Sequence, residues 1–241
     1  MRKLLLIIYF PGSSGMWLEY FLTNHNEIVP KGIVEIEGKN EYFINYGNKI
    51  HDRWMADRLE RKKLIDQVKN MQSAINRDGV THDIRNFKYI TFTSHIWDED
   101  KENNWGNKED TILLGIGFTS DDLLRYIKRF LFTKHNSKKP MPGLFRKMDQ
   151  EADDFVNRYR EQITTKNIPS YIINYNKFFI KQDVNEYINL CEFLKIIPDI
   201  EMYKKAIDYY MYMNYKLCKE LPTDVEIEYV HKDGVLDYVI L

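Results

Sequence analysis

Tyr9-Phe10-Pro11-Gly12-Ser13-Ser14-Gly15-Met16-Trp17-Leu18 follows directly on the apolar run Lys3-Leu4-Leu5-Leu6-Ile7-Ile8, and the two segments together decide the fold. The apolar run is typical of a buried strand, the Gly/Ser segment of a tight loop, and the segment that begins near Ser14 of a helix. Backbone N–H groups at such a helix start lie at the positive end of the helix dipole and favour a phosphate or sulfate group. No Gly-Lys-Ser/Thr follows the loop, so it is not a Walker A motif. The sequence therefore predicts an anionic, nucleotide-like ligand but not an ordinary NTPase.

Composition is that of a folded globular protein. The chain has 241 residues, a hydrophobic content of 44% and a formal net charge of −1. At this length a single domain over residues 1–241 is the natural expectation, and a nearly neutral chain has no basic field to attract nucleic acid. Cys191 and Cys218 lack the spacing of a metal site and indicate a reduced, intracellular protein, with one disulfide between them as the alternative.

The apolar segments are too short to span a bilayer. The run at the N-terminus lies at the short end of the range for a signal peptide, and more aromatic and apolar residues follow it. We therefore interpret it as the first strand of the fold, and expect a cytoplasmic protein with no membrane partner.

The hydrophobic pattern predicts strands that alternate with helices. The expected strands cover residues 3–10, 87–93, 111–118 and 170–175, with one or two edge strands between 225 and 241. The expected helices cover residues 14–24, 54–76, 123–133, 148–163, 183–194 and 201–219, and the basic segment 134–147 is expected to be a loop. This alternation predicts an α/β fold with a parallel sheet flanked by helices. Ligands of such sheets bind at the carboxyl ends of the strands, so the loops after residues 10, 93 and 118 should lie close together.

Two of these loops carry a resemblance to the cytosolic-type, PAPS-dependent sulfotransferases. The 5′-phosphosulfate loop of that family has the form Tyr-Pro-Lys-Ser-Gly-Thr-Thr-Trp-Leu. The segment from Phe10 to Leu18 aligns with it without a gap and shares Pro, Ser, Trp and Leu. The family's second landmark is a strand ending in Lys-Thr-His-Leu, whose His is the catalytic base, and Thr93-Ser94-His95-Ile96 is similar to it in type and position.

Two further landmarks of the family appear in the same order. The third is a strand followed by Arg-Asn-Pro-x-Asp and then a helix that bears a Ser-Tyr pair; in the family the motif and this Ser bind the 3′-phosphate. Here the corresponding segment is Gly117-Phe118-Thr119-Ser120-Asp121, and Arg125-Tyr126 in the helix that follows stands at the Ser-Tyr position. The fourth is a strand ending in Tyr-Glu-Asp-Leu and a helix ending in Phe-Leu-Gly, which Tyr175-Asn176-Lys177-Phe178 and Glu192-Phe193-Leu194-Lys195 resemble. The resemblance thus extends over residues 4–197.

The resemblance implies a P-loop nucleotide-binding-like three-layer sandwich. It also implies transfer of a sulfuryl group from PAPS to a hydroxyl or amine of a small-molecule or carbohydrate acceptor, without a metal. His95 would be the catalytic base. The residues expected to bind the donor are Gly12, Ser13, Ser14, Gly15, Met16 and Trp17 at the phosphosulfate, and Ser120 and Arg125 at the 3′-phosphate.

The sequence departs from the family at charged positions. The lysine of the phosphosulfate loop, which contacts the bridging oxygen of the donor, is replaced by Gly12, and the arginine of the third landmark falls at Gly117. The serine of that landmark falls at Arg125, which would supply a positive charge from the helix instead.

Plainer interpretations stay open for each of these residues. The Gly/Ser loop is alternatively a tight β–α turn, His95 a packed histidine, Arg125 a solvated side chain and Ser120 an N-cap. Two other functions remain as well. One is a nucleotide-kinase-like phosphotransferase, which the missing Lys-Ser/Thr pair disfavours, and the other is a non-catalytic relative that has lost donor binding.

Overall fold

A four-stranded parallel sheet forms the centre of the computed structural model, which describes residues 2–10, 12–29, 70, 72–75, 81–83, 85–95, 108–128, 142–164, 168–218, 227–232 and 235–240. The strands lie in the order β4-β1-β5-β6. Their bounds are β1 Lys3–Tyr9, β4 Tyr89–His95, β5 Thr111–Gly117 and β6 Ser170–Asn174. The predicted α/β class with a parallel sheet and flanking helices is confirmed.

β1 is buried along almost its whole length. The side chains from Leu4 to Ile7 are 0% exposed, and those from Ile8 to Phe10 are also buried. A parallel strand with helices on both faces has no solvent side, so its sequence is a continuous apolar run rather than an alternating one. Burial of each such aliphatic side chain contributes about 1.5–3 kcal/mol. The apolar run therefore holds the strand at the centre of the fold.

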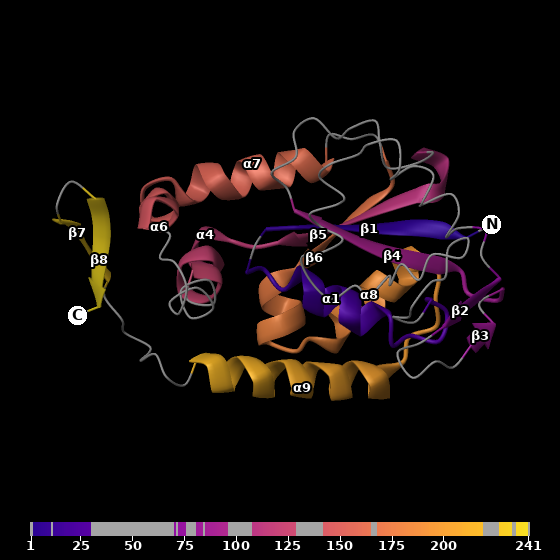
Figure 1. Cartoon of the computed structure of the whole chain (residues 1–241). Helices are drawn as coiled ribbons and strands as arrows, with labels where there is room; N and C mark the ends of the chain where they lie inside the picture. The colour runs from indigo at the N-terminus through magenta and orange to yellow at the C-terminus, as the bar shows by residue number, and fades with distance from the viewer. Residues whose placement is uncertain are drawn as a thin grey trace.

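Helices cover both faces of the sheet (Figure 1). On one face lies α7, with α6 beside it; on the other lie α1, α8 and α9. Their bounds are α1 Gly15–Leu22, α6 Pro142–Gln150, α7 Ala152–Thr164, α8 Val184–Leu194 and α9 Ile200–Cys218. Close packing of α7 requires a residue without a side chain in β5, because a Cβ atom at Gly115 would lie 2.4 Å from Ile163 Cδ1.

Two small antiparallel sheets lie outside the parallel one. One pairs β2 (Ser73–Ile75) with β3 (Thr81–Asp83), and the other pairs β7 (Ile227–Lys232) with β8 (Val235–Ile240) beside α6. Two strands are thus present near the C-terminus as predicted, but they form a sheet of their own and are not edge strands of the parallel sheet. The helix predicted over 54–76 is wrong at its end, where β2 lies, and its part up to residue 69 lies outside the described residues.

The predicted loop over 134–147 is also wrong in part. Residues 142–147 belong to α6, while 134–141 lie outside the described residues. Pro142 is the first residue of that helix, where the fixed φ of proline and its missing N–H are tolerated. Within the described ranges, no helix has both the length and the apolar character needed to cross a bilayer.

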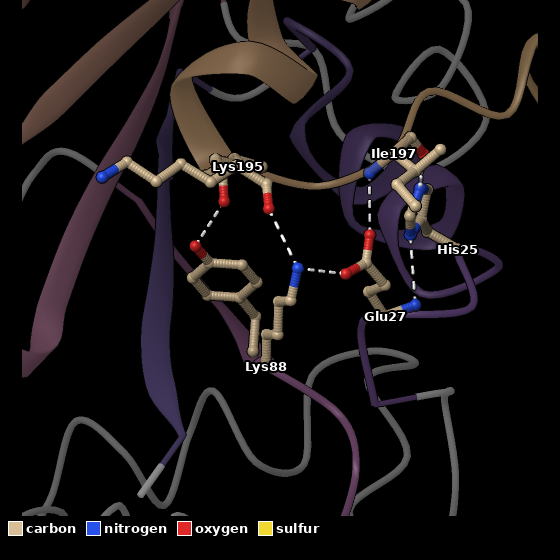
Figure 2. A network of polar contacts seen from close by, with 7 residues as sticks. His25, Glu27, Lys88, Lys195 and Ile197 are labelled. Carbon is tan, nitrogen blue, oxygen red and sulfur yellow. Dashed lines mark hydrogen bonds and ion pairs between the residues drawn. The ribbon is translucent and has the colours of Figure 1, made fainter.

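A polar network fixes the end of α8 at the edge of the sheet where the strands begin (Figure 2). Lys88 Nζ donates to the carbonyl oxygen of Lys195 at 3.0 Å and forms an ion pair with Glu27. Glu27 Oε2 accepts from the Ile197 N–H at 2.8 Å, and His25 Nε2 lies 2.8 Å from the Ile197 carbonyl oxygen. A cation at the C-terminus of a helix interacts favourably with the helix dipole. The network thus joins the segment after α1, the start of β4 and the α8–α9 connection.

Candidate functional site

The sheet has a topological switch point between β1 and β5. The chain leaves β1 for α1 on one face, and after β5 it continues to α7 on the other face (Figure 1). In open α/β sheets a crevice forms at such a point, outside the carboxyl ends of the strands, and this is where ligands bind. The loops after β1 and β5 therefore flank the candidate site.

A tyrosine of α7 holds the two strands apart at this point. The β1–β5 pairing ends with Ile8 opposite Gly115. Beyond it, Tyr159 Oη donates to the Ile8 carbonyl oxygen at 2.9 Å and accepts from the Ile116 N–H at 3.0 Å. Burial raises the pKa of Tyr159 above its ordinary range, so the phenol stays protonated. One side-chain oxygen thus bridges the two strands where their direct pairing ends.

The loop after β1 is a tight turn in which Ser13 faces inward. Gly12 has φ 87°, and Ser14, the N-cap of α1, has φ 69°, so both adopt the left-handed conformation. The backbone N–H and the hydroxyl of Ser13 both donate to the Phe10 carbonyl oxygen, at 2.9 and 2.7 Å. The Ser13 hydroxyl, predicted to bind the donor, therefore closes the turn in this structure.

Glycine at position 15, the first residue of α1, allows the Tyr9 ring to lie very close to the helix backbone. A Cβ atom there would lie 2.0 Å from Cγ of Tyr9, whose ring covers the start of the helix. Burial, with a smaller contribution from the Glu19 carboxylate, raises the pKa of Tyr9. Glycine is thus needed at the position where β1 and α1 meet.

Met16 and Trp17 pack along α1. Both are partly buried against the hydrophobic core. The Trp17 ring makes edge contacts with Tyr20 at 5.8 Å and with Tyr210 of α9 at 5.4 Å, measured between ring centroids. Trp17 therefore fills the contact between α1 and α9.

Three buried hydroxyl groups meet beside the loop. Ser14 Oγ lies 2.7 Å from Tyr210 Oη. The Tyr175 phenol is the third group, and burial, followed by its neighbour Tyr210, raises its pKa well above the ordinary value. Sequence reasoning quoted Tyr175 only within the fourth landmark and did not identify Tyr210. The position of Tyr175 directly after β6 was a usable signal, whereas Tyr210 belongs to a helical apolar stripe that gives none.

The loops after β5 and β6 are joined by a buried carboxylate. Thr119 and Asp122 form a capping box at the short helix α4 (Ser120–Asp122), in which Asp122 Oδ2 accepts from the Thr119 N–H at 3.0 Å. Asp122 Oδ1 accepts from Asn176 Nδ2 at 2.8 Å. The side chain of Asp122 thus fixes the start of both connections.

Each of these connections continues as a π-helical turn. One is η3 (Leu123–Ile127) after β5, and the other is η4 (Asn176–Ile180) after β6. π-Helical turns are rare and are found frequently at functional sites. Both of them follow neighbouring strands at the same edge of the sheet.

Ser120 and Arg125, predicted to hold the 3′-phosphate, form contacts with carboxylates. The Ser120 hydroxyl is hydrogen-bonded to Asp153 of α7, and Arg125 Nε lies 2.6 Å from Asp121. The Arg125 side chain is 70% exposed, so this ion pair is in water. The N-cap here is Thr119, so the alternative interpretation of Ser120 as an N-cap is wrong.

His95 ends β4 and lies opposite Tyr9, the last residue of β1. The backbone of the predicted base is therefore next to the Gly/Ser loop, as the expected clustering of loops requires. Gly117, the position at which the arginine of the third landmark falls, lies close to β6, because a Cβ atom there would be 2.5 Å from Ile172 Cγ2. The lack of a side chain at position 117 thus allows β5 to pack closely against β6.

No family model matches the sequence, and no curated protein matches it. In the part of the chain that the structure describes, no three His, Cys, Asp or Glu side chains form a group that could hold a metal ion. The candidate site consists of backbone amides, hydroxyl groups, one buried carboxylate and its amide partner.

Proposed function

We propose that this protein is a sulfotransferase with a P-loop nucleotide-binding-like three-layer sandwich. It moves a sulfuryl group from PAPS to a hydroxyl or amine of a small-molecule or carbohydrate acceptor, in the cytoplasm. One observation carries the proposal: the first three segments that resemble the sulfotransferase landmarks, and the Tyr175–Phe178 part of the fourth, lie at the carboxyl ends of the parallel strands β1, β4, β5 and β6. The Glu192–Lys195 part of the fourth ends α8 at the opposite edge. Segments far apart in sequence thus lie at one edge, where such sheets bind ligands.

The loop after β1 would hold the phosphosulfate through its backbone. Both serine hydroxyls bond within the protein, Ser13 to Phe10 and Ser14 to Tyr210. The Ser13 N–H also donates to the Phe10 carbonyl oxygen. The amides of Gly12, Ser14, Gly15 and Met16, which include the first turn of α1, would therefore bind the anion, because the first turn of a helix has no intrahelical acceptors. The proposal therefore assigns the donor to main-chain N–H groups rather than to the serine side chains.

His95 would act as the base at the same edge. An imidazole titrates near neutral pH and can accept the proton of an acceptor hydroxyl or amine. The acceptor oxygen or nitrogen then bonds to sulfur while the bond from sulfur to the bridging oxygen breaks, and 3′-phosphoadenosine 5′-phosphate leaves. Positioning and charge stabilisation supply most of the acceleration in transfers of this type.

A second candidate is a non-catalytic relative of the same fold. Two observations favour it: Ile172 occupies the space beside Gly117, and Arg125 pairs with Asp121 in solvent. In such a protein the Gly/Ser loop would be a structural turn.

Thermal unfolding with 3′-phosphoadenosine 5′-phosphate, and with ATP as the control, separates these functions. Ligand at about a hundredfold above its dissociation constant stabilises the folded state by about 2.7 kcal/mol, which raises the midpoint by roughly 5–10 °C in a chain of this size. A shift with the bisphosphate alone supports the sulfotransferase. A shift with ATP alone would instead indicate a phosphotransferase, and no shift with either would leave the non-catalytic relative.

A further inference from the structure

The hairpin of β7 and β8 is a two-stranded sheet of its own. Its register runs from Ile227 opposite Ile240 to Lys232 opposite Val235. The hairpin lies apart from the parallel sheet, and β8 is the strand that contacts α6 (Figure 1). An isolated two-stranded hairpin is at best marginally stable in water, and further strands or a supporting helix are needed to stabilise it. Since α6 supports β8, β7 is the strand that would gain most from a further strand.

The second edge of β7 is a candidate interaction surface. Within the described ranges, β7 pairs with β8 and with no other strand. The row of N–H and C=O groups along such an edge is a template for pairing with a strand of another chain. Binding of this kind takes its affinity from main-chain hydrogen bonds, and the residues along the strand give its specificity. The sequence of β7 therefore indicates which strand would pair with it.

The charged residues of β7 are arranged symmetrically about Val230. Glu228 stands two positions before Val230, and Lys232 stands two positions after it. When two copies of this strand pair antiparallel with Val230 opposite Val230, Glu228 of each copy is opposite Lys232 of the other. Opposite charges at such positions stabilise an antiparallel pair, and like charges destabilise it. The strand is thus complementary to itself, as a two-fold symmetric interface requires.

The hairpin alone does not place opposite charges at these positions. Its register sets Glu228 opposite Val239 and Lys232 opposite Val235. A second β7 strand on the outer edge would bring an opposite charge to each of them. β8 lacks this self-complementarity, because Asp237 is its only charged residue. A second copy of the chain therefore fits the edge of β7 better than the edge of β8.

We propose that this protein forms a symmetric dimer in which β7 pairs antiparallel with β7 of a second copy, about a two-fold axis at Val230. The result is a continuous sheet in the order β8-β7-β7-β8, which gives each hairpin the further strands that stabilise it. The interface is isologous, because both copies use the same surface. The inference goes beyond the proposed function and does not depend on it.

Exchange of charges in the whole chain tests the pairing. Sedimentation velocity at a series of protein concentrations measures the dissociation constant of the dimer. Glu228→Lys and Lys232→Glu each set two pairs of like charges opposite each other, and each should weaken the dimer about tenfold. The double variant restores opposite charges and should return to within about threefold of wild type. An equimolar mixture of the two single variants should form heterodimers, because every charged pair between them is again of opposite sign.

Glu192→Lys is the matched control for the change of charge. Glu192 is exposed in the last turn of α8. Because isolated surface charges contribute little, this variant should stay within about twofold of the wild-type dissociation constant. The urea midpoint of each variant checks that it folds.

A cross-link tests the register without a change of charge, and it remains available if an exchanged variant fails to fold. Opposite residues of an antiparallel pair have Cα atoms about 4.5–5.5 Å apart, which a disulfide can span. Val230→Cys should therefore give a covalent dimer on oxidation. Ile227→Cys should not, because the two copies of position 227 would lie about 20 Å apart along the strands. The wild type shows any background from Cys191 and Cys218.

A wild type that is monomeric at every concentration would overturn the proposal. A dimer that neither single exchange weakens would also overturn it, as would a loss that neither the double variant nor the mixture restores, since the interface would then lie elsewhere on the molecule. Absence of the cross-link in Val230→Cys would overturn the register about Val230. None of these results bears on donor binding, so the proposed function stands or falls separately.

Discussion

Replacing Tyr159 by phenylalanine removes the oxygen atom that joins β1 to β5 at the switch point. That oxygen donates to the Ile8 carbonyl and accepts from the Ile116 N–H, and the residue is 4% exposed. The ring would stay in place, but two buried main-chain groups would lose their partner.

The cost follows from those two groups. A buried polar group without a hydrogen bond costs about 1–3 kcal/mol, so the variant should lose about 2–4 kcal/mol of its free energy of unfolding if the strands relax in part. For a chain of this length that corresponds to a midpoint lower by roughly 5–15 °C. Urea denaturation followed by circular dichroism, together with a thermal melt, measures both quantities.

Tyr126→Phe is the control, because Tyr126 is a half-buried tyrosine away from the strand junction. It should change the free energy of unfolding by less than about 0.5 kcal/mol. A loss of that small size in Tyr159→Phe as well would refute the reasoning: the strands would then have closed on each other, and the phenol would not be what holds them apart.

Three further predictions concern the loop, the base and the network of Figure 2. Gly15→Ala should lower the free energy of unfolding by about 1–3 kcal/mol in urea denaturation, because the new methyl group meets the Tyr9 ring; an unchanged urea midpoint would contradict this. His95→Ala should abolish sulfuryl transfer while calorimetry shows donor binding as in the wild type, and unchanged turnover would remove His95 from the mechanism. Burial opposes ionisation of Glu27, but the hydrogen bonds from Lys88 and the Ile197 amide hold its pKa below 4.5. Its contribution to stability is thus present at neutral pH and is lost as the pH falls through that lowered pKa, so Glu27→Gln should reduce the difference between urea midpoints measured at pH ~7 and ~3.5. If the urea midpoints at the two pH values differed equally in the wild type and in Glu27→Gln, this role of the Glu27 carboxylate would be contradicted.

The parallel strands were predictable because buried strands have a strong local signal. β1 and β5 are largely apolar runs; β1 is followed by the loop that contains Gly12, and β5 ends with Gly117. β2 was not predictable, since Ser73–Ile75 is short and follows a segment with helical periodicity, and helix and strand are ambiguous in short apolar runs. Pro142 and Gly143 in a basic segment predict a loop, whereas α6 begins at Pro142, because proline is tolerated at the first position of a helix.

Only those parts of the candidate site that depend on short stretches of sequence were predictable. The β1 loop and the end of β4 follow from sequence order and the geometry of parallel sheets. The inward turn of the Ser13 hydroxyl depends on the backbone conformation of one loop, and the contact of Tyr210 with Ser14 joins residues 196 positions apart. Local sequence patterns do not indicate which distant residues form such contacts.

The network at the end of α8 has a consequence for the order in which the chain folds. Lys88 and Lys195 are 107 positions apart, and Glu27 and Ile197 are 170 apart. Closing loops of this size costs conformational entropy before the contacts that offset this cost have formed, so such pairings form slowly. During synthesis, Lys88 and Glu27 therefore lack their partners in the α8–α9 connection until that connection has left the ribosome. These contacts form only after the chain up to Ile197 has been made.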